Sequence, residues 1–172
     1  MRGSIRFFVS SVCAAIVIYG CSGGSSPEAG GTGDGSINTS HDAVAKEFGN
    51  DVLKGDWGAA YSLTTPEFQA TTSQADLQKQ FDDVEAEFVK DDPNFKPSTV
   101  QVDHGSLPSN EDEAQRLYHW KVVPPKDTWR AWSFVLIGVG SADEFASGPE
   151  AQVLVVDVNG QDRLGHVEFV RP

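Results

Sequence analysis

The stretch QVLVVDVNGQDRLGHVEFV, residues 152–170, decides the fold class of this chain. Two valine-containing runs, residues 152–158 and 164–170, are separated by a short polar segment that includes the pair Asn159-Gly160. Asparagine and glycine tolerate the positive φ angles of a two-residue turn, so the pattern predicts a β-hairpin. Because a hairpin joins antiparallel neighbours, the end of the chain is expected to lie in an antiparallel sheet.

Three further strand candidates precede this hairpin, each with apolar residues at every second position. Their apolar faces are Val100 and Val102; Tyr118, Trp120 and Val122; and Trp132, Phe134 and Leu136. The acidic residues 111–113 are interpreted as a solvated loop in front of the second candidate. The sequence therefore predicts a sheet of four or five antiparallel strands.

The preceding part of the chain has helical periodicity instead. The expected apolar stripes are Val44, Phe48 and Val52; Trp57, Ala60 and Tyr61; and Leu77, Phe81, Val84 and Phe88. Thr39 or Ser40 is expected to cap the first helix, and Gly55 to end it. Asp56 is expected to cap the second helix, and Ser73 with Asp76 to form a capping box on the third. The prediction is an α+β fold, with three N-terminal helices on one face of a curved antiparallel sheet.

The N-terminus has the layout of a secretory signal. Arg2 and Arg6 precede an apolar run over residues 7–19. This run is shorter than the roughly 20 residues that span a bilayer. The sequence Ile18-Tyr19-Gly20-Cys21 resembles the lipobox of bacterial lipoproteins, in which the cysteine is acylated and begins the mature chain. The resemblance implies a signal peptide over residues 1–20 and a lipid on Cys21. It places the mature protein outside the cytoplasm, on the outer membrane if the host has two.

Charge and cysteine content limit the partners and the chemistry that the mature chain can have. Residues 21–39 are rich in glycine and serine and are expected to form a flexible tether before a domain over residues 40–172. Loss of the signal leaves 11 basic against 25 acidic residues, a net charge of −14, which disfavours nucleic acid as a partner. With Cys13 removed and Cys21 lipidated, no cysteine remains for a disulfide, a thiol nucleophile or a metal site.

One family resemblance extends over most of residues 41–172. It rests on Gly55-Asp56-Trp57, Ala59-Ala60-Tyr61, Thr65-Pro66-Glu67-Phe68 and the closing stretch VVDVNGQDRLGHVEFVRP, residues 155–172. In this order they resemble the nuclear transport factor 2-like, or cystatin-like cone, superfamily. The resemblance implies a cone-like domain with an open end that can hold a small apolar molecule. It does not imply one activity, because the superfamily includes enzymes, transport adaptors and accessory domains.

Aromatic residues are the candidates for lining such a cone. A weak ligand pocket is predicted from Trp57, Tyr61, Tyr118, Trp120, Trp132 and Asp157, with Phe134 and Phe169 also expected to point inward. The same aromatics could simply fill the core. Asp157 could act as an inward carboxylate, but its position beside a turn equally suits a solvated or turn-capping aspartate.

No metal or cofactor is expected. His166 and Glu168 are two residues apart and therefore share a strand face, but no histidine or cysteine ligand motif strengthens a metal site. Phosphate-binding and serine-hydrolase motifs are also missing from the sequence.

Three functions remain open from the sequence. The first is a non-enzymatic envelope lipoprotein whose domain binds an envelope protein or acts as an accessory module. The second is a binding module for a small apolar ligand, and the third is a proton-transfer or hydrolytic enzyme that uses the cone pocket. The first is preferred, because the anchor is well marked and the sequence lacks a catalytic motif.

Overall fold

The structure is a computed structural model, and it describes residues 41–118, 120, 122–140 and 147–172. The chain divides into two units, Met1–Gly35 and Ser36–Pro172, and all described residues belong to the second. The predicted signal peptide, Cys21 and the tether lie outside the described residues. Among the described residues, no helix is both long enough and apolar enough to cross a membrane.

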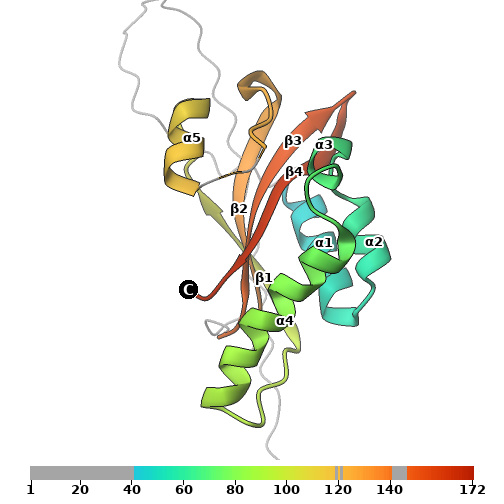
Figure 1. The fold of residues 1–172 in the computed structure, drawn as a ribbon, viewed down its shortest axis with the longest axis vertical. Helices are drawn as coiled ribbons and strands as arrows, with labels where there is room; N and C mark the ends of the chain where they lie inside the picture. Colours follow the sequence, from blue (N-terminus) through green and yellow to red (C-terminus); the bar gives the residue numbers. More distant parts are fainter. Residues whose placement is uncertain (1–40, 119, 121, 141–146) are drawn as a thin grey trace, which may run out of the picture. The chain divides into compact units, whose positions relative to one another are not determined.

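The domain is α+β, with most of its helices before its strands (Figure 1). The elements are α1 (Asp42–Lys54), α2 (Trp57–Ser62), α3 (Pro66–Gln69), α4 (Gln74–Asp91), β1 (Thr99–Gly105), α5 (Glu111–Tyr118), the 3₁₀ turn η2 (Lys126–Thr128), β2 (Trp129–Gly138), β3 (Glu150–Val158) and β4 (Gln161–Val170). Among the described residues, four helices precede β1, where the sequence predicted three. The addition is the single turn α3, which begins at Pro66 and is capped by the Thr65 side chain.

Local signals set the ends of these helices as expected. Gly55 follows α1 in the left-handed conformation, with a φ of 75°. The Asp56 carboxylate accepts the N–H of Ala59 at 3.0 Å, and Ser73 and Asp76 form the reciprocal capping box of α4. The predicted caps of α1, Thr39 and Ser40, lie outside the described residues.

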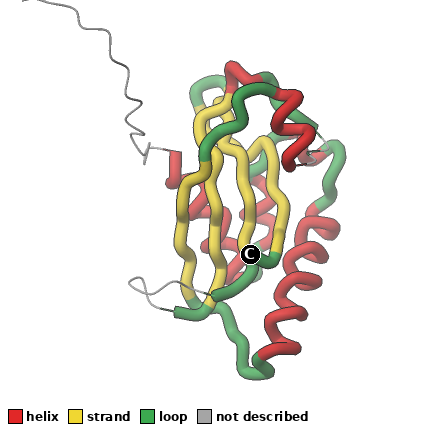
Figure 2. The backbone as a smooth tube through the Cα atoms, turned by 90° about the vertical axis from the view of Figure 1, so that its left-hand side faces the viewer, coloured by secondary structure: helices red, strands yellow, loops and turns green. Residues whose placement is uncertain are grey.

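The four strands form one antiparallel sheet in the order β1-β2-β3-β4. The hairpin between β3 and β4 turns at Asn159 and Gly160, whose φ angles are 56° and 80°, so the predicted tight turn is confirmed. Figure 2 shows the sheet from the side opposite α1 and α2. Helix α5 crosses one end of this far face, and no other helix of the described residues lies on it.

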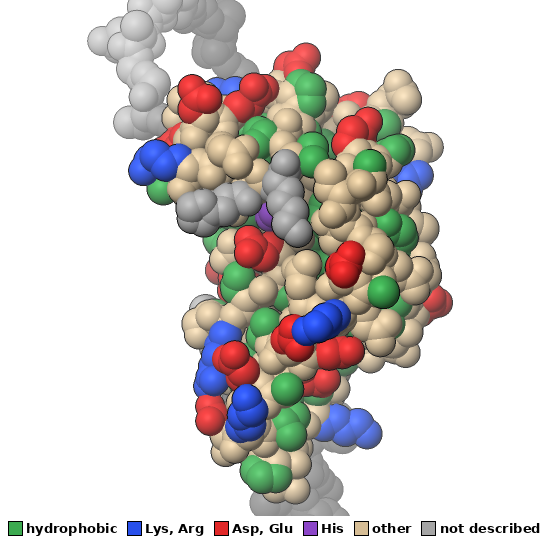
Figure 3. Space-filling model, in the orientation of Figure 1, with side chains coloured by type: hydrophobic (Ala, Val, Ile, Leu, Met, Phe, Trp, Pro, Cys, Tyr) green, Lys and Arg blue, Asp and Glu red, His purple; other side chains and the backbone are tan. Residues whose placement is uncertain are grey.

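The strand predicted over residues 117–122 is wrong, because α5 occupies residues 111–118. The Asn110 side chain accepts the N–H of Glu113 at 2.8 Å, and the Glu113 carboxylate accepts the N–H of Ser109 at 2.6 Å. The Ser109 hydroxyl also donates to this carboxylate, and the two Ser109 bonds lower the pKa of Glu113, with the hydroxyl bond as the largest cause. The acidic residues 111–113 are thus the first turn of a helix, where the helix dipole favours negative charge. Figure 3 shows acidic side chains gathered over this helix.

Two apolar cores flank the sheet, one on each face. The core on the helix side joins α1, α2, α3 and α4 to the sheet through residues such as Phe48, Leu77 and Val153. The far-side core lies under α5 and the connection to β2. Its buried members are Ala114, Trp120, Trp129, Trp132, Leu154 and Val156. The sheet therefore separates two groups of side chains that sequence alternation had assigned to one interior.

Candidate functional site

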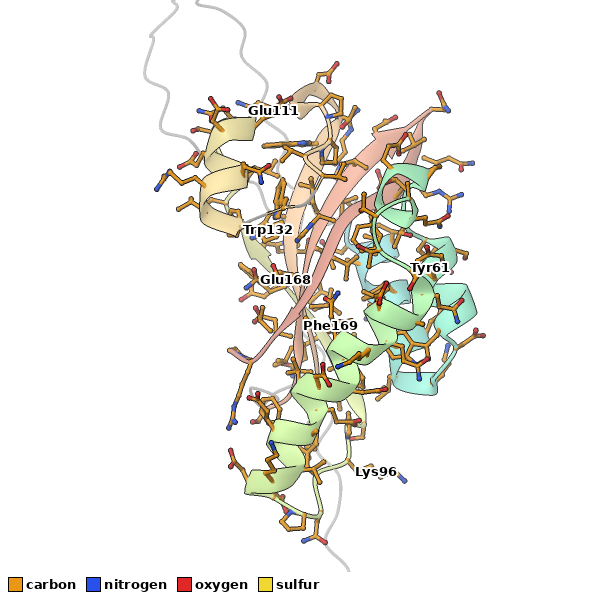
Figure 4. All side chains as sticks on the ribbon, in the orientation of Figure 1. Tyr61, Lys96, Glu111, Trp132, Glu168 and Phe169 are labelled. Atoms are coloured by element: carbon orange, nitrogen blue, oxygen red, sulfur yellow. The ribbon has the colours of Figure 1, made fainter. Side chains whose placement is uncertain are left out.

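The six residues of the predicted pocket do not line one cavity. Trp57 and Tyr61 belong to the helix-side core, whereas Tyr118, Trp120 and Trp132 belong to the far-side core. Figure 4 shows Trp132 near α5 and Tyr61 on the side of the helices. The prediction that Trp132 and Phe134 share one face of β2 is confirmed, since both contact the far-side core. The aromatic residues of the helices pack on the opposite face of the sheet.

The far-side tryptophans form a closed aromatic cluster. Trp120 and Trp132 are 0% and 1% exposed, and their ring centroids lie 5.3 Å apart. The imidazole of His166 stacks on Trp120 with a centroid distance of 5.1 Å. These rings pack against one another beneath α5, an arrangement that suits core filling.

On the helix side, the other two predicted pocket residues are also engaged in packing. The ring of Trp57 contacts Phe81 and Phe169 with centroid distances of 5.6 and 6.3 Å. The Tyr61 hydroxyl donates to the carbonyl of Thr72 at 2.9 Å and so ties α2 to the segment before α4. Neither side chain is placed to offer a reactive group to a ligand.

Asp157 has the contacts of a turn-capping residue. Its Oδ1 accepts the N–H of Gly160 at 2.8 Å, and its Oδ2 lies 3.1 Å from Nη2 of Arg130. These contacts lower the pKa of Asp157, with the Gly160 hydrogen bond as the largest cause. A general base that works near neutrality needs a raised carboxyl pKa, so the environment of Asp157 opposes that role.

Three histidines lie beside carboxylates. Nδ1 of His41 lies 2.8 Å from Oδ2 of Asp162, and Nε2 of His104 lies 3.2 Å from Oδ2 of Asp42. These two pairs join the start of α1 to β4 and to β1. They are connections between elements that the sequence reasoning missed, because each pair spans more than 60 residues.

The third pair is His166 with Glu168, whose Nε2 and Oε2 lie 3.8 Å apart. The two residues share a strand face, as their spacing in the sequence predicted. A cavity of about 230 Å³ lies beside them, bordered by Phe68, Thr72 and Gln80 among others. Among the residues that the structure describes, no group of three or more potential ligands could hold a metal ion.

A serine, a histidine and an aspartate also come together near the start of α1. Ser133 is the cross-strand partner of His104, which in turn contacts Asp42. However, Ser133 is 0% exposed, and its hydroxyl has no hydrogen-bond partner among the described residues. A nucleophile must reach both its base and its substrate, so this group does not form a catalytic triad.

A groove with a volume of about 560 Å³ lies beside the β3–β4 hairpin. We call it the Val-Pro groove. Its apolar lining consists of Val122, Val123, Pro124, Pro125, Val156 and Val158. Its polar lining consists of Thr65, Glu67, Thr128, Asp157 and Asn159. A largely apolar surface with a few polar groups is typical of sites for small molecules.

Contacts of Pro124 fix one wall of the Val-Pro groove. The indole N–H of Trp129 donates to the carbonyl of Pro124 at 2.9 Å. Pro124 also lies against Gly165, where an added Cβ would come within 2.8 Å of the proline ring. The run Val-Val-Pro-Pro, residues 122–125, was the available signal for an apolar wall.

Compared with family models, with curated proteins and with solved structures, the chain has no match.

Proposed function

We propose that this chain is an envelope lipoprotein with a non-enzymatic binding domain. The N-terminal order of charge, apolar run, small residue and Cys21 supports a lipid anchor and a location outside the cytoplasm, on the outer membrane where the host has two. The contacts of Asp157, His41 and His104 support binding over catalysis, because these groups join elements of the fold. The proton-transfer or hydrolytic alternative receives no support from them.

The observation that carries the proposal is the Val-Pro groove. Its volume of about 560 Å³ falls within the range of roughly 300–1,000 Å³ that ligand sites occupy. The ligand class that fits is small and apolar or amphipathic, with its polar end toward Glu67 and Asn159. A short apolar segment of an envelope protein is the alternative occupant.

We also propose that the domain is cone-like, with a sheet that curves around the start of α1. His41 and Asp42 are adjacent in the chain, yet they contact Asp162 on β4 and His104 on β1, the two outermost strands. In a flat four-stranded sheet these strands lie about 14 Å apart, at roughly 4.8 Å between neighbours. Two adjacent residues contact both edges more easily if the sheet curves around the start of α1, as in the family that the sequence resembles.

Photolabelling of the full chain in membranes tests the Val-Pro groove. A small alkyl diazirine probe is activated by light, and the labelled peptides are identified by mass spectrometry. We expect labels on residues 122–125 and 156–158. In Val158→Asp this labelling should fall by about tenfold, the factor that corresponds to 1.4 kcal/mol of lost binding free energy.

Val89→Asp is the matched control, because Val89 is 41% exposed on α4 and does not line the groove. It introduces the same charge and should leave labelling unchanged. Labels spread evenly over the chain, or an equal loss in both variants, would contradict the assignment of the groove.

A further inference from the structure

The outer edge of β1 is open along its length among the residues that the structure describes. Strand β1 pairs with β2 from Thr99 to Gly105, and no other described strand pairs with it. The opposite edge of the sheet is different, because residues 63–65 meet β4. There Leu164 donates its N–H to Leu63 and accepts the N–H of Thr65, both at 2.9 Å. The sheet thus has one edge closed in part and one open edge.

Hydrogen bonds in β2 show which backbone groups of β1 point outward. Ile137 donates its N–H to Pro149 at 2.9 Å, and Val139 donates to Ser147 at 3.0 Å, so these residues face β3. Backbone groups alternate along an antiparallel strand, so the intervening residues of β2 face β1. Their partners in β1 are Gln101, opposite Leu136, and Asp103, opposite Phe134.

The residues between them, Val100, Val102 and His104, therefore direct their N–H and C=O groups away from the sheet. The N–H of His104 agrees with this direction, because it is accepted by the Asp103 side chain at 2.8 Å rather than by β2. Within the described part of the chain, the open edge consequently offers a row of unpaired backbone donors and acceptors at Val100 and Val102.

A cavity of about 570 Å³ adjoins this edge. Its lining consists of residues 100–103 of β1, Asp42 and Lys46 of α1, Phe134 and Leu136 of β2, and Glu150 of β3. Natural sheets protect open edges with proline, bulges, short strands or inward charges. Strand β1 has seven residues, contains no proline and pairs with β2 in a regular register.

We propose that a second copy of this chain binds here, with the two β1 strands antiparallel about a twofold axis through Val102. This register overlaps all seven residues of β1. It places Val102 opposite Val102 of the second copy, Gln101 opposite Asp103, and Val100 opposite His104. No like charges face each other directly, whereas an axis through Asp103 opposes two carboxylates. The product is a continuous sheet of eight strands.

Disulfide formation in membranes tests this register with the full chain. Val102→Cys brings two thiols together on the axis, with a separation between Cα atoms of about 5.5 Å, which a disulfide accepts. Oxidation should then double the mass on a non-reducing gel. Val100→Cys is the matched control and should stay monomeric, whereas Val100→Cys combined with His104→Cys should cross-link.

The wild-type chain is oxidised in parallel. Cross-linking of the wild type would show that Cys13 or Cys21 carries a free thiol, which contradicts the proposed lipoprotein. The β1 register is then tested by the same variants in a chain with both native cysteines replaced by serine. A monomeric Val102→Cys, or equal cross-linking of Val100→Cys, would overturn the proposed dimer.

A second measurement compares variants that all carry Val102→Cys, so that any effect of the cysteine on folding is common to them. In the Val102→Cys background, Gln101→Glu opposes Asp103 of the second copy twice per dimer, and Gln101→Lys pairs with it twice. The cross-linking yield should be about tenfold higher for Gln101→Lys than for Gln101→Glu. Opposite charges across two strands stabilise the pairing and like charges destabilise it, and each dimer contains two such pairs. Gln74→Glu adds the same charge on α4 and should have no effect. Equal yields for the two Gln101 variants would overturn the proposal.

Discussion

Asp157 illustrates how the role of a single residue depends on its nearest contacts. In sequence it is an acidic residue in an apolar strand, which suggested either a buried catalytic group or a turn cap. The N–H of Gly160 and the guanidinium of Arg130 both favour its ionised form. Its lowered pKa has a consequence for the pH dependence of stability.

We expect the Asp157→Asn variant to melt at a lower temperature than the wild type at neutral pH. A carboxyl with a lowered folded pKa stabilises the fold above its unfolded pKa, near 4, and this contribution disappears as the pH falls through the folded pKa. The difference in Tm should therefore be constant above about pH 5 and narrow below about pH 4. Circular dichroism melts at a series of pH values measure it. A difference that persists at the lowest pH would show that the charge of Asp157 is not responsible.

Helix caps and turns could be predicted from the sequence, because they depend only on residues that are near one another in the chain. The caps Asp56 and Ser73 and the turn Asn159-Gly160 act within a few residues, and the structure confirms them. The candidate pocket could not be predicted in this way. Whether Trp57 and Trp132 share a cavity depends on which face of the sheet the helices cover, and alternation within one strand carries no such information.

At the scale of elements, α5 shows the limit of periodicity over short segments. Tyr118, Trp120 and Val122 alternate like a strand, but the Asn110 cap and the Ser109–Glu113 bonds begin a helix at Glu111, seven residues before Tyr118. The segment then covers the far face with Trp120. A strand and a short capped helix both bury these aromatics, so hydrophobicity did not distinguish them.

The irregularity in β4 provides a prediction at the same scale. The pairing of β3 with β4 shifts between Leu154 and Val155, which leaves Gly165 as an extra residue. A Cβ at this position would lie 2.8 Å from Pro124 and 2.9 Å from Val156. Gly165→Ala should therefore lower the free energy of unfolding by about 1–3 kcal/mol, as overpacking typically does.

The matched control is Gly58→Ala in α2, where an added Cβ meets only Asp56 at 3.8 Å. Alanine favours a helix over glycine by about 1 kcal/mol, so this variant should be as stable as the wild type or more stable. Urea unfolding of both variants makes the comparison. A loss of stability in Gly58→Ala equal to that in Gly165→Ala would attribute the effect to glycine replacement in general.

At the scale of the whole molecule, the proposed anchor makes one cysteine distinct from the other. Growth with labelled palmitate should label the wild-type chain, and mass spectrometry should find a mature N-terminus at acylated Cys21. Cys21→Ser should abolish the label, because the lipid is attached through that sulfur. Cys13→Ser should retain it. A label that survives Cys21→Ser, or an unmodified Met1 in the membrane fraction, would contradict the anchor.

The contacts at the start of α1 have a mechanical consequence. His41 is where the N-terminal chain enters the described domain, and the neighbouring pairs reach Asp162 on β4 and His104 on β1. A pull along that chain is therefore divided between the two outermost strands instead of peeling one strand from the sheet. With the proposed lipid anchor at the N-terminus, the domain should therefore bear drag at a membrane surface while its sheet remains intact.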